Sequence, residues 1–114
     1  MKRWFAGALL PLLAGVPDAN AQTYPAKPIR MIVPFAIGGG TDIVARAVAL
    51  KIGEACGQSV VVDNKTGANG NIGMELAAKA PPDGYTIIMT SSALAINPSM
   101  YKGLGYAAVN VYAP

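Results

Sequence analysis

The sequence predicts an α/β fold in which strands and helices alternate to build a parallel sheet. Short apolar runs, rich in β-branched residues, occur at 29–34, 59–63 and 85–90. These runs show no apolar/polar alternation, which is typical of strands covered on both faces. Helical apolar spacing occupies the intervening segments 43–55 and 71–80. The resulting order, β-α-β-α-β, implies right-handed crossovers and a three-stranded parallel core.

The first strand and helix are separated by a glycine-rich loop. Ile29–Pro34 is an apolar run closed by proline, and three consecutive glycines end the loop Phe35–Gly40. Thr41 is then the expected helix N-cap, and Asp42 just inside it favours the positive end of the helix dipole. Gly57 is a plausible residue to end the helix. Its core-facing stripe is expected to contain Val44, Ala47, Val48 and Ile52.

The second half of the pattern repeats this arrangement. Ser59–Asp63 is a continuous β-branched run, and Asn64–Gly70 is a polar loop that contains glycine. Asn71–Ala80 is expected to form a short helix that is stopped by the two prolines after it. Tyr85–Thr90 completes the set as the third strand. The residues that follow show no sustained period, so no further element is predicted.

The first 21 residues have the character of a secretory signal peptide. Lys2 and Arg3 precede the apolar run Trp4–Val16, and Ala19–Ala21 supplies the small residues of a cleavage site. The alternative is an uncleaved membrane anchor, although the run falls short of the roughly 20 residues that span a bilayer. We therefore expect cleavage after Ala21, export to a bacterial periplasm, and a mature domain over 22–114.

Composition narrows the classes of function. The formal charge of +3 is weak and scattered along the chain, so no nucleic-acid interface is expected. There is no histidine and one cysteine, which excludes histidine-dependent triads, Cys/His zinc sites and an internal disulfide. The six acids are spread over different predicted elements, with no general base paired to a nucleophile. Binding is favoured over catalysis, with no metal and no cofactor.

Ligand contacts are expected in the loops at the carboxyl ends of the strands. The glycines before Thr41 would let backbone N–H groups approach a carboxylate or phosphate. Thr41 could donate a hydrogen bond from its hydroxyl, and Asp42 could accept one from an amine, a ligand hydroxyl or a water. Asn71 and Ser91 could add polar contacts from the other two loops. A plain strand-to-helix turn and a capping serine explain the same residues without a ligand. An alternative function is a small phosphate- or nucleotide-binding domain using Gly38–Thr41, although both phosphate-loop fingerprints fail.

A series of motifs then resembles one known family, the periplasmic solute receptors of tripartite tricarboxylate transporters, often called Bug-type receptors. Each motif is weak alone, but together they follow the order and spacing of the family over nearly the whole mature chain. They are Tyr24–Phe35, Gly38–Arg46, Gly57–Asn64, Gly67–Gly73, Pro82–Thr86 and Ile96–Tyr101.

The resemblance implies a non-enzymatic receptor with two α/β lobes and a ligand cleft between them. Such receptors take small carboxylates and deliver them to a membrane permease of a large and a small subunit. No cofactor is implied. Carried onto this sequence, the expected ligand-binding residues are Phe35, Gly39, Gly40, Thr41 and Asp42, with Asn71 and Ser91 as weaker candidates.

The length of the chain limits what the resemblance implies. Removing 21 of the 114 residues leaves 93, whereas two lobes need about 100 residues or more each. We therefore expect residues 22–114 to form part of the N-terminal lobe of a periplasmic-binding-protein-like fold. A chain truncated in this way is expected to bind its ligand weakly or not at all when alone.

Overall fold

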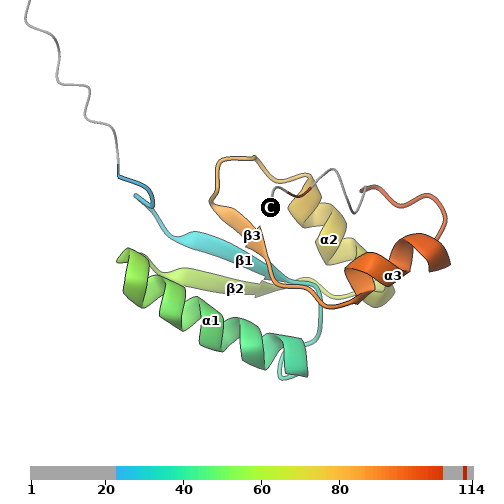
Figure 1. Cartoon of the computed structure of the whole chain (residues 1–114), viewed down its shortest axis with the longest axis horizontal. Helices are drawn as coiled ribbons and strands as arrows, with labels where there is room; N and C mark the ends of the chain where they lie inside the picture. The colour runs from blue at the N-terminus through green and yellow to red at the C-terminus, as the bar shows by residue number, and fades with distance from the viewer. Residues whose placement is uncertain (1–22, 107–111, 113–114) are drawn as a thin grey trace, which may run out of the picture.

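The computed structural model describes residues 23–106 and residue 112 (Figure 1). The predicted signal peptide lies outside these described residues. Three strands and three α-helices alternate along the chain, with a short 3₁₀ turn before the second helix. In chain order they are β1 (Ile29–Val33), α1 (Gly40–Cys56), β2 (Val60–Asn64), η1 (Ala68–Gly70), α2 (Asn71–Ala78), β3 (Thr86–Ile88) and α3 (Ala93–Met100).

The three strands form one parallel sheet in the order β2-β1-β3, which confirms the predicted parallel core. Met31 in β1 pairs with Val62 of β2 on one side and with Ile87 of β3 on the other. β1 is therefore the central strand, and four of its five residues are buried. Its mostly apolar sequence follows from this position, because a strand lies on each side of it and a helix covers each face. The exception is Arg30, which is partly exposed and pairs with Asp63.

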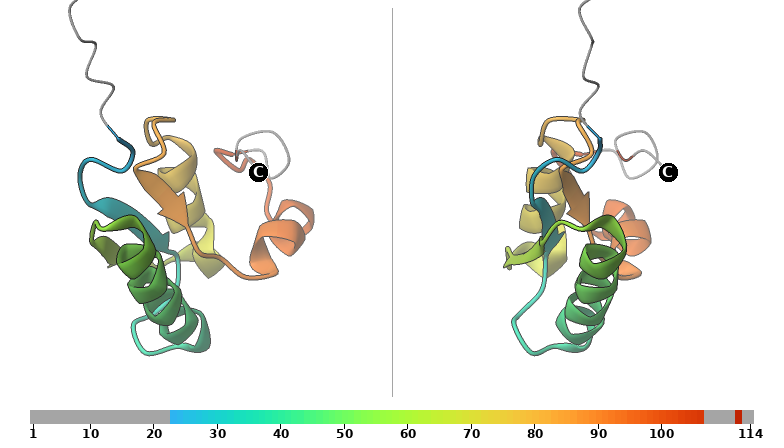
Figure 2. Two further views of the ribbon diagram at one scale, coloured as in Figure 1. Left: turned by 60° about the vertical axis from the view of Figure 1, so that its left-hand side comes forward. Right: turned by 90° about the vertical axis from the view of Figure 1, so that its left-hand side faces the viewer.

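The helices cover the sheet from opposite sides, with α1 on one face and α2 on the other (Figures 1 and 2). Because successive side chains of a strand point to opposite faces of the sheet, one part of the core lies under α1 and the other under α2. Met31 and Val33 pack with Ala45 and Ala49 of α1, while Met74 of α2 anchors a second cluster on the other face. Phe35 packs against both clusters, so the residue that opens the first loop also joins the two halves of the core.

The exposed face of α1 differs from the predicted one. Asp42, Ala45 and Ala49 are the buried residues of the helix, whereas Val44 is 54% exposed and Ala47 is exposed. Val48 and Ile52 do pack on the core, as predicted. The buried stripe of the helix is therefore offset from its most hydrophobic one, and small residues, Ala45 and Ala49, face the sheet. The buried side of α1 thus combines one polar residue, Asp42, with the two small residues Ala45 and Ala49.

Helix α3 was not predicted, because the residues after the third strand show no sustained period. It also includes Pro98, a residue that normally interrupts a helix. The helix is only two turns long, so proline removes few hydrogen bonds. Its start is held by Ser91, whose Oγ accepts the N–H of Ala93 at 3.2 Å. Its end is held by Asn97, whose carbonyl accepts the N–H of Tyr101 at 2.9 Å. Among the described residues, no helix has the length and hydropathy to cross a membrane.

Candidate functional site

The candidate site lies where the chain leaves β1 and β3, two neighbouring strands of the sheet. The segment after β1 runs to α1 on one face, whereas the segment after β3 runs to α3, which contacts α2 on the other face. Loops that diverge in this way open a crevice at the carboxyl ends of the strands. The amino-terminal ends of the three helices lie at this same end of the molecule (Figure 1).

The loop after β1, residues 34–39, ends in glycines whose backbone conformations differ. Gly38 has a φ of +83°, a left-handed conformation that a side chain would strain. Gly39 is extended, with φ −72° and ψ 168°, and it is the N-cap of α1. The prediction that Thr41 caps the helix is therefore wrong, since the helix begins at Gly40 and Thr41 lies inside its first turn.

A glycine N-cap has a chemical consequence for this end of α1. Among the described residues, no side chain caps the first-turn amides, because the N-cap is a glycine and has no side chain. The first turn contains Gly40, Thr41 and Asp42, and the first helical hydrogen bond runs from Ile43 N–H to the Gly39 carbonyl at 3.0 Å. The positive end of the α1 dipole and its leading N–H groups can therefore face an anion.

Asp42 is buried at 1% exposure and is the centre of a polar cluster. Its Oδ2 accepts the Gly38 N–H at 2.8 Å and the Arg46 Nε–H at 2.9 Å, while its Oδ1 accepts the Asn64 Nδ2–H at 2.9 Å. The hydrogen bond from Arg46, followed by those from Gly38 and Asn64, lowers the pKa of Asp42 to about 2 despite its burial. The carboxylate is thus ionised and directed into the protein.

This cluster predicts how stability responds to acid. The pKa of Asp42 falls from 3.8 to about 2 on folding, so its contribution is complete above about pH 4 and is lost as pH falls through 2. Asp63 acts in the same direction: burial opposes ionisation, but Arg30 and Lys65 lower its pKa overall. Asp42→Asn should therefore reduce the loss of melting temperature between about pH 5 and about pH 2.

Thermal unfolding followed by circular dichroism measures this effect. Glu54→Gln is the matched control, because Glu54 is an exposed carboxylate on the same helix that pairs with Lys51 at 2.9 Å. The control should keep the pH dependence of the unchanged protein. An Asp42→Asn protein with that same pH dependence would show that the carboxylate is not held in its ionised form by folding.

Two members of the cluster were missed by sequence reasoning. Arg46 stands four residues after Asp42, a helical spacing that could have suggested the ion pair. Asn64 ends β2 and donates from Nδ2 to the Phe35 carbonyl at 3.1 Å as well as to Asp42. Its partners lie 22 and 29 residues away, and no local pattern signals contacts of that kind.

Phe35 connects this loop to the start of α2. Its side chain is half-buried, and a Cβ built on Gly70 would lie 3.1 Å from its Cζ. Gly70 is also the N-cap of α2 and has a φ of +90°. The lack of a side chain at Gly70 therefore brings the aromatic ring against the second loop, as well as permitting the left-handed turn.

Asn71, the first residue of α2, is buried and bonded within the protein. Its Oδ1 accepts from Asn97 Nδ2–H at 2.8 Å and from the Tyr106 hydroxyl at 2.7 Å. Asn97 also donates to the Asn69 carbonyl at 2.9 Å and accepts from the Asn69 amide at 2.9 Å. This second polar cluster links the loop before α2 to α3.

The end of β3 contributes the remaining candidates. Ser91 is exposed, and its hydroxyl oxygen accepts the Ala93 N–H, as the capping interpretation predicted. Beside it, Thr90 Oγ1 is a buried polar atom with no hydrogen-bond partner among the described residues. Sequence reasoning did not single out Thr90, because a threonine at the end of a β-branched run is also typical of a plain strand.

The predicted site residues thus share one edge of the sheet but differ in what they can offer. Phe35 presents an aromatic ring, Gly39, Gly40 and Thr41 present backbone groups, and Ser91 presents an exposed hydroxyl. Asp42 and the Oδ1 of Asn71 are occupied by internal contacts. Within residues 23–106 and 112, no three potential metal-ligating side chains gather. This arrangement suits an anionic group that accepts hydrogen bonds.

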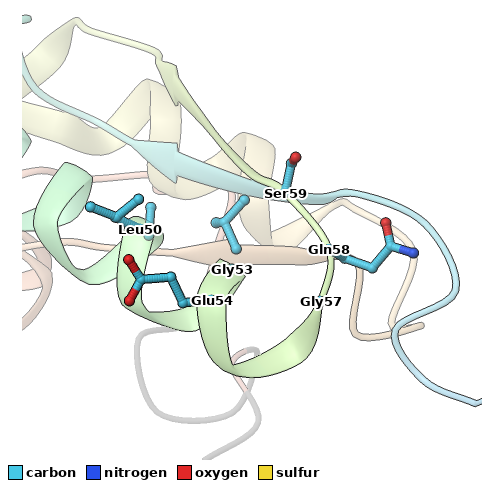
Figure 3. A pocket seen from close by; sticks show the side chains of 8 residues that line it. Leu50, Gly53, Glu54, Gly57, Gln58 and Ser59 are labelled. Atoms are coloured by element: carbon cyan, nitrogen blue, oxygen red, sulfur yellow. The ribbon is translucent and has the colours of Figure 1, made fainter.

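A different hollow lies at the opposite end of the sheet. It has a volume of about 450 Å³ and lies between the end of α1 and the start of β2 (Figure 3). Its lining includes Leu50, Gly53, Glu54, Gln58 and Ser59. Its one charged group, Glu54, already pairs with Lys51. It lies at the amino end of β2, away from the glycine loop.

Comparisons with known proteins point to one family. The model for tripartite tricarboxylate transporter family receptors matches residues 44–114. A UPF0065 protein of Bordetella pertussis is 44% identical over 100 residues, covering 87% of this chain and 31% of its own length. The chain therefore spans about a third of the length of such curated relatives.

Solved structures agree with the sequence relatives. The periplasmic binding protein BugD is 45% identical with a TM-score of 0.78, covering 80% of this chain and 30% of its own. An R. palustris protein solved with adipate is 40% identical with a TM-score of 0.71, covering 75% of this chain and 29% of its own. The predicted family resemblance and the predicted partial periplasmic-binding-protein fold are both confirmed.

Proposed function

The chain belongs to the family of tripartite tricarboxylate transporter receptors, and from this premise we propose that its carboxyl-edge loops form part of a binding site for a small carboxylate. The single observation that carries the proposal is the start of α1. A glycine N-cap leaves the first-turn amides without a side-chain partner, and the nearby acid, Asp42, is paired with Arg46. A ligand carboxylate would meet N–H donors and a positive helix end without an opposing free charge.

The class of ligand is supported by the family and by the chemistry of the loop. The R. palustris relative was solved with adipate, a dicarboxylate. Phosphate sites usually add a cation to the backbone donors. Here the cation beside the glycine loop, Arg46, is engaged by Asp42 and by Asn64 Oδ1 at 3.1 Å. A carboxylate, with less charge to neutralise than a phosphate, is therefore favoured over the phosphate or nucleotide alternative.

The remaining parts of the proposal concern the receptor as a whole. We infer a non-enzymatic role, because the site offers hydrogen-bond donors but no nucleophile paired with a base. Export with residues 1–21 as a cleaved signal would place the protein in the periplasm, where BugD is described as a binding protein. Delivery of the ligand to membrane permease subunits is the corresponding role in transport. Since the relatives are about three times longer, high affinity is expected to need contacts beyond residues 23–106.

A titration followed by NMR tests the proposed site. Adding adipate to the ¹⁵N-labelled chain should shift the amide resonances of Gly39, Gly40 and Thr41 most, with a Kd of roughly 1 mM or weaker. The weak affinity is expected because one set of loops supplies only part of a binding cleft. Adipamide, which has the same shape without charge, is the matched control ligand and should leave these resonances unchanged.

Two results would contradict the proposed site. One is an equal response of the three amides to adipate and to adipamide, which would exclude recognition of charge. The other is a set of adipate-dependent shifts scattered over the surface, with none at the start of α1.

A further inference from the structure

The side chain of Asn64 joins the end of β2 to both ends of the glycine loop. Its two N–H groups are both used, one by the Phe35 carbonyl at 3.1 Å and one by Asp42 Oδ1 at 2.9 Å. Its Oδ1 accepts from Arg46 Nη2 at 3.1 Å. Phe35 precedes the glycines and Asp42 follows them, so one amide holds the segment at its beginning and at its end.

The loop needs such support because of its composition. Three consecutive glycines lose more conformational freedom on ordering than other residues would. Within the loop, Gly38 is held by the Asp42 carboxylate at 2.8 Å, and Gly39 N–H donates to the Ala36 carbonyl at 3.2 Å. The contact between Gly38 and Asp42 depends on the orientation of the carboxylate. Arg46 holds the same oxygen, Oδ2, that Gly38 contacts, whereas Asn64 holds the other oxygen, Oδ1.

Asn64 itself is held by the sheet. It pairs with Val33 in the β1–β2 register, and the next residue, Lys65, donates its N–H to the Val33 carbonyl at 2.9 Å. Its position is thus set by backbone hydrogen bonds that do not involve the loop. A side chain on a rigid strand can impose its geometry on a flexible loop, whereas the reverse is unfavourable.

We propose that Asn64 is a positioning residue, which holds the Phe35–Asp42 segment so that the amides at the start of α1 are preorganised for the ligand. The role of the amides rests on the proposed function, whereas the holding of the loop does not. Asparagine suits this task because a carboxamide supplies two donors and one acceptor in one plane. Aspartate at this position would supply no donor and would face the carboxylate of Asp42.

The test measures the loop and the ligand separately in Asn64→Ala. The amide of Gly38 should exchange with solvent about tenfold faster than in the unchanged chain, the size expected for weakening a hydrogen bond to a charged group. The NMR-detected titration midpoint of Asp42 should rise, because the hydrogen bond from Asn64 is one cause of its low pKa. Adipate should shift the Gly40 and Thr41 amides with affinity weakened by about tenfold.

Val61→Ala is the matched control, since Val61 lies on the same strand and is 54% exposed. It should leave all three measurements unchanged. If Asn64→Ala does not fold, Asn64→Ser carries the same test, because a hydroxyl keeps the site polar but cannot span the three partners. Retained slow exchange of β1 and β2 amides shows that a variant is folded.

The outcomes separate the two proposals. Unchanged Gly38 exchange and an unchanged Asp42 midpoint in a folded Asn64 variant would overturn the positioning role. If both change but the unchanged chain shows no adipate-specific shifts, Asn64 does hold the loop, and it is the carboxylate site that fails. Changes in the loop without any loss of adipate affinity would overturn the claim of preorganisation.

Discussion

Replacing Gly73 by alanine is expected to destabilise the protein by about 3 kcal/mol or more, at or above the usual range for overpacking. A Cβ at this position would lie 2.6 Å from the Lys65 carbonyl oxygen, 2.6 Å from Pro34 Cβ and 2.8 Å from Pro34 Cα. Two of these three atoms belong to the backbone, and Pro34 is fully buried, so neither Lys65 nor Pro34 can move easily to make room for the added Cβ. Helix α2 would have to move away from the end of β1.

This result is the opposite of what helix propensity alone predicts. Alanine in a helix interior is normally favoured over glycine by about 1 kcal/mol. Gly40→Ala is the matched control, because Gly40 also lies in a helix and nothing is found within 4 Å of its added Cβ. Urea denaturation should show a large loss for Gly73→Ala and little change for Gly40→Ala. Equal stabilities for the two variants would contradict the close packing of α2 on β1.

The second large effect is expected for the buried methionines of the two core clusters. Met31→Ala and Met74→Ala should each cost about 2–5 kcal/mol, from lost transfer free energy and the cavity left behind. Met31 is 1% exposed beneath α1, and Met74 is 0% exposed on the other face of the sheet. The two variants therefore test both layers of the fold.

Met100→Ala provides a control with identical chemistry. Met100 is 67% exposed at the end of α3, so its removal should change the free energy of unfolding by less than about 0.5 kcal/mol. Urea denaturation of the three variants compares them directly. A cost at Met74 as small as that at Met100 would show that α2 is not packed on the sheet as described.

Sequence patterns predicted most of the secondary structure because they reflect local physics. Short apolar runs rich in β-branched residues marked the strands, and Gly57 ended α1 in a left-handed conformation with φ 70°, as expected. The errors arose where local signals conflict with tertiary contacts. α3 contains a proline, β3 is three residues long where six were predicted, and α1 turns its most hydrophobic stripe partly toward solvent.

At the candidate site, too, local features could be predicted from the sequence and long-range contacts could not. The glycine loop could be located from composition, because only glycine accommodates backbone such as that at Gly38. The partners of Asp42 could not be assigned in full, and the sequence suggested that this carboxylate faces a ligand. In the structure it accepts from Gly38, Arg46 and Asn64 and is buried.

The sequence by itself determined the order of the strands and helices from β1 to β3, the place of the glycine loop and the family to which the chain belongs. These depend on neighbouring residues or on motifs in a fixed order. The tertiary structure alone decided that Asn64 closes the first polar cluster and that Asn97 closes the second. Each of those contacts joins residues more than 20 positions apart, and such pairs meet only after the sheet has set their register.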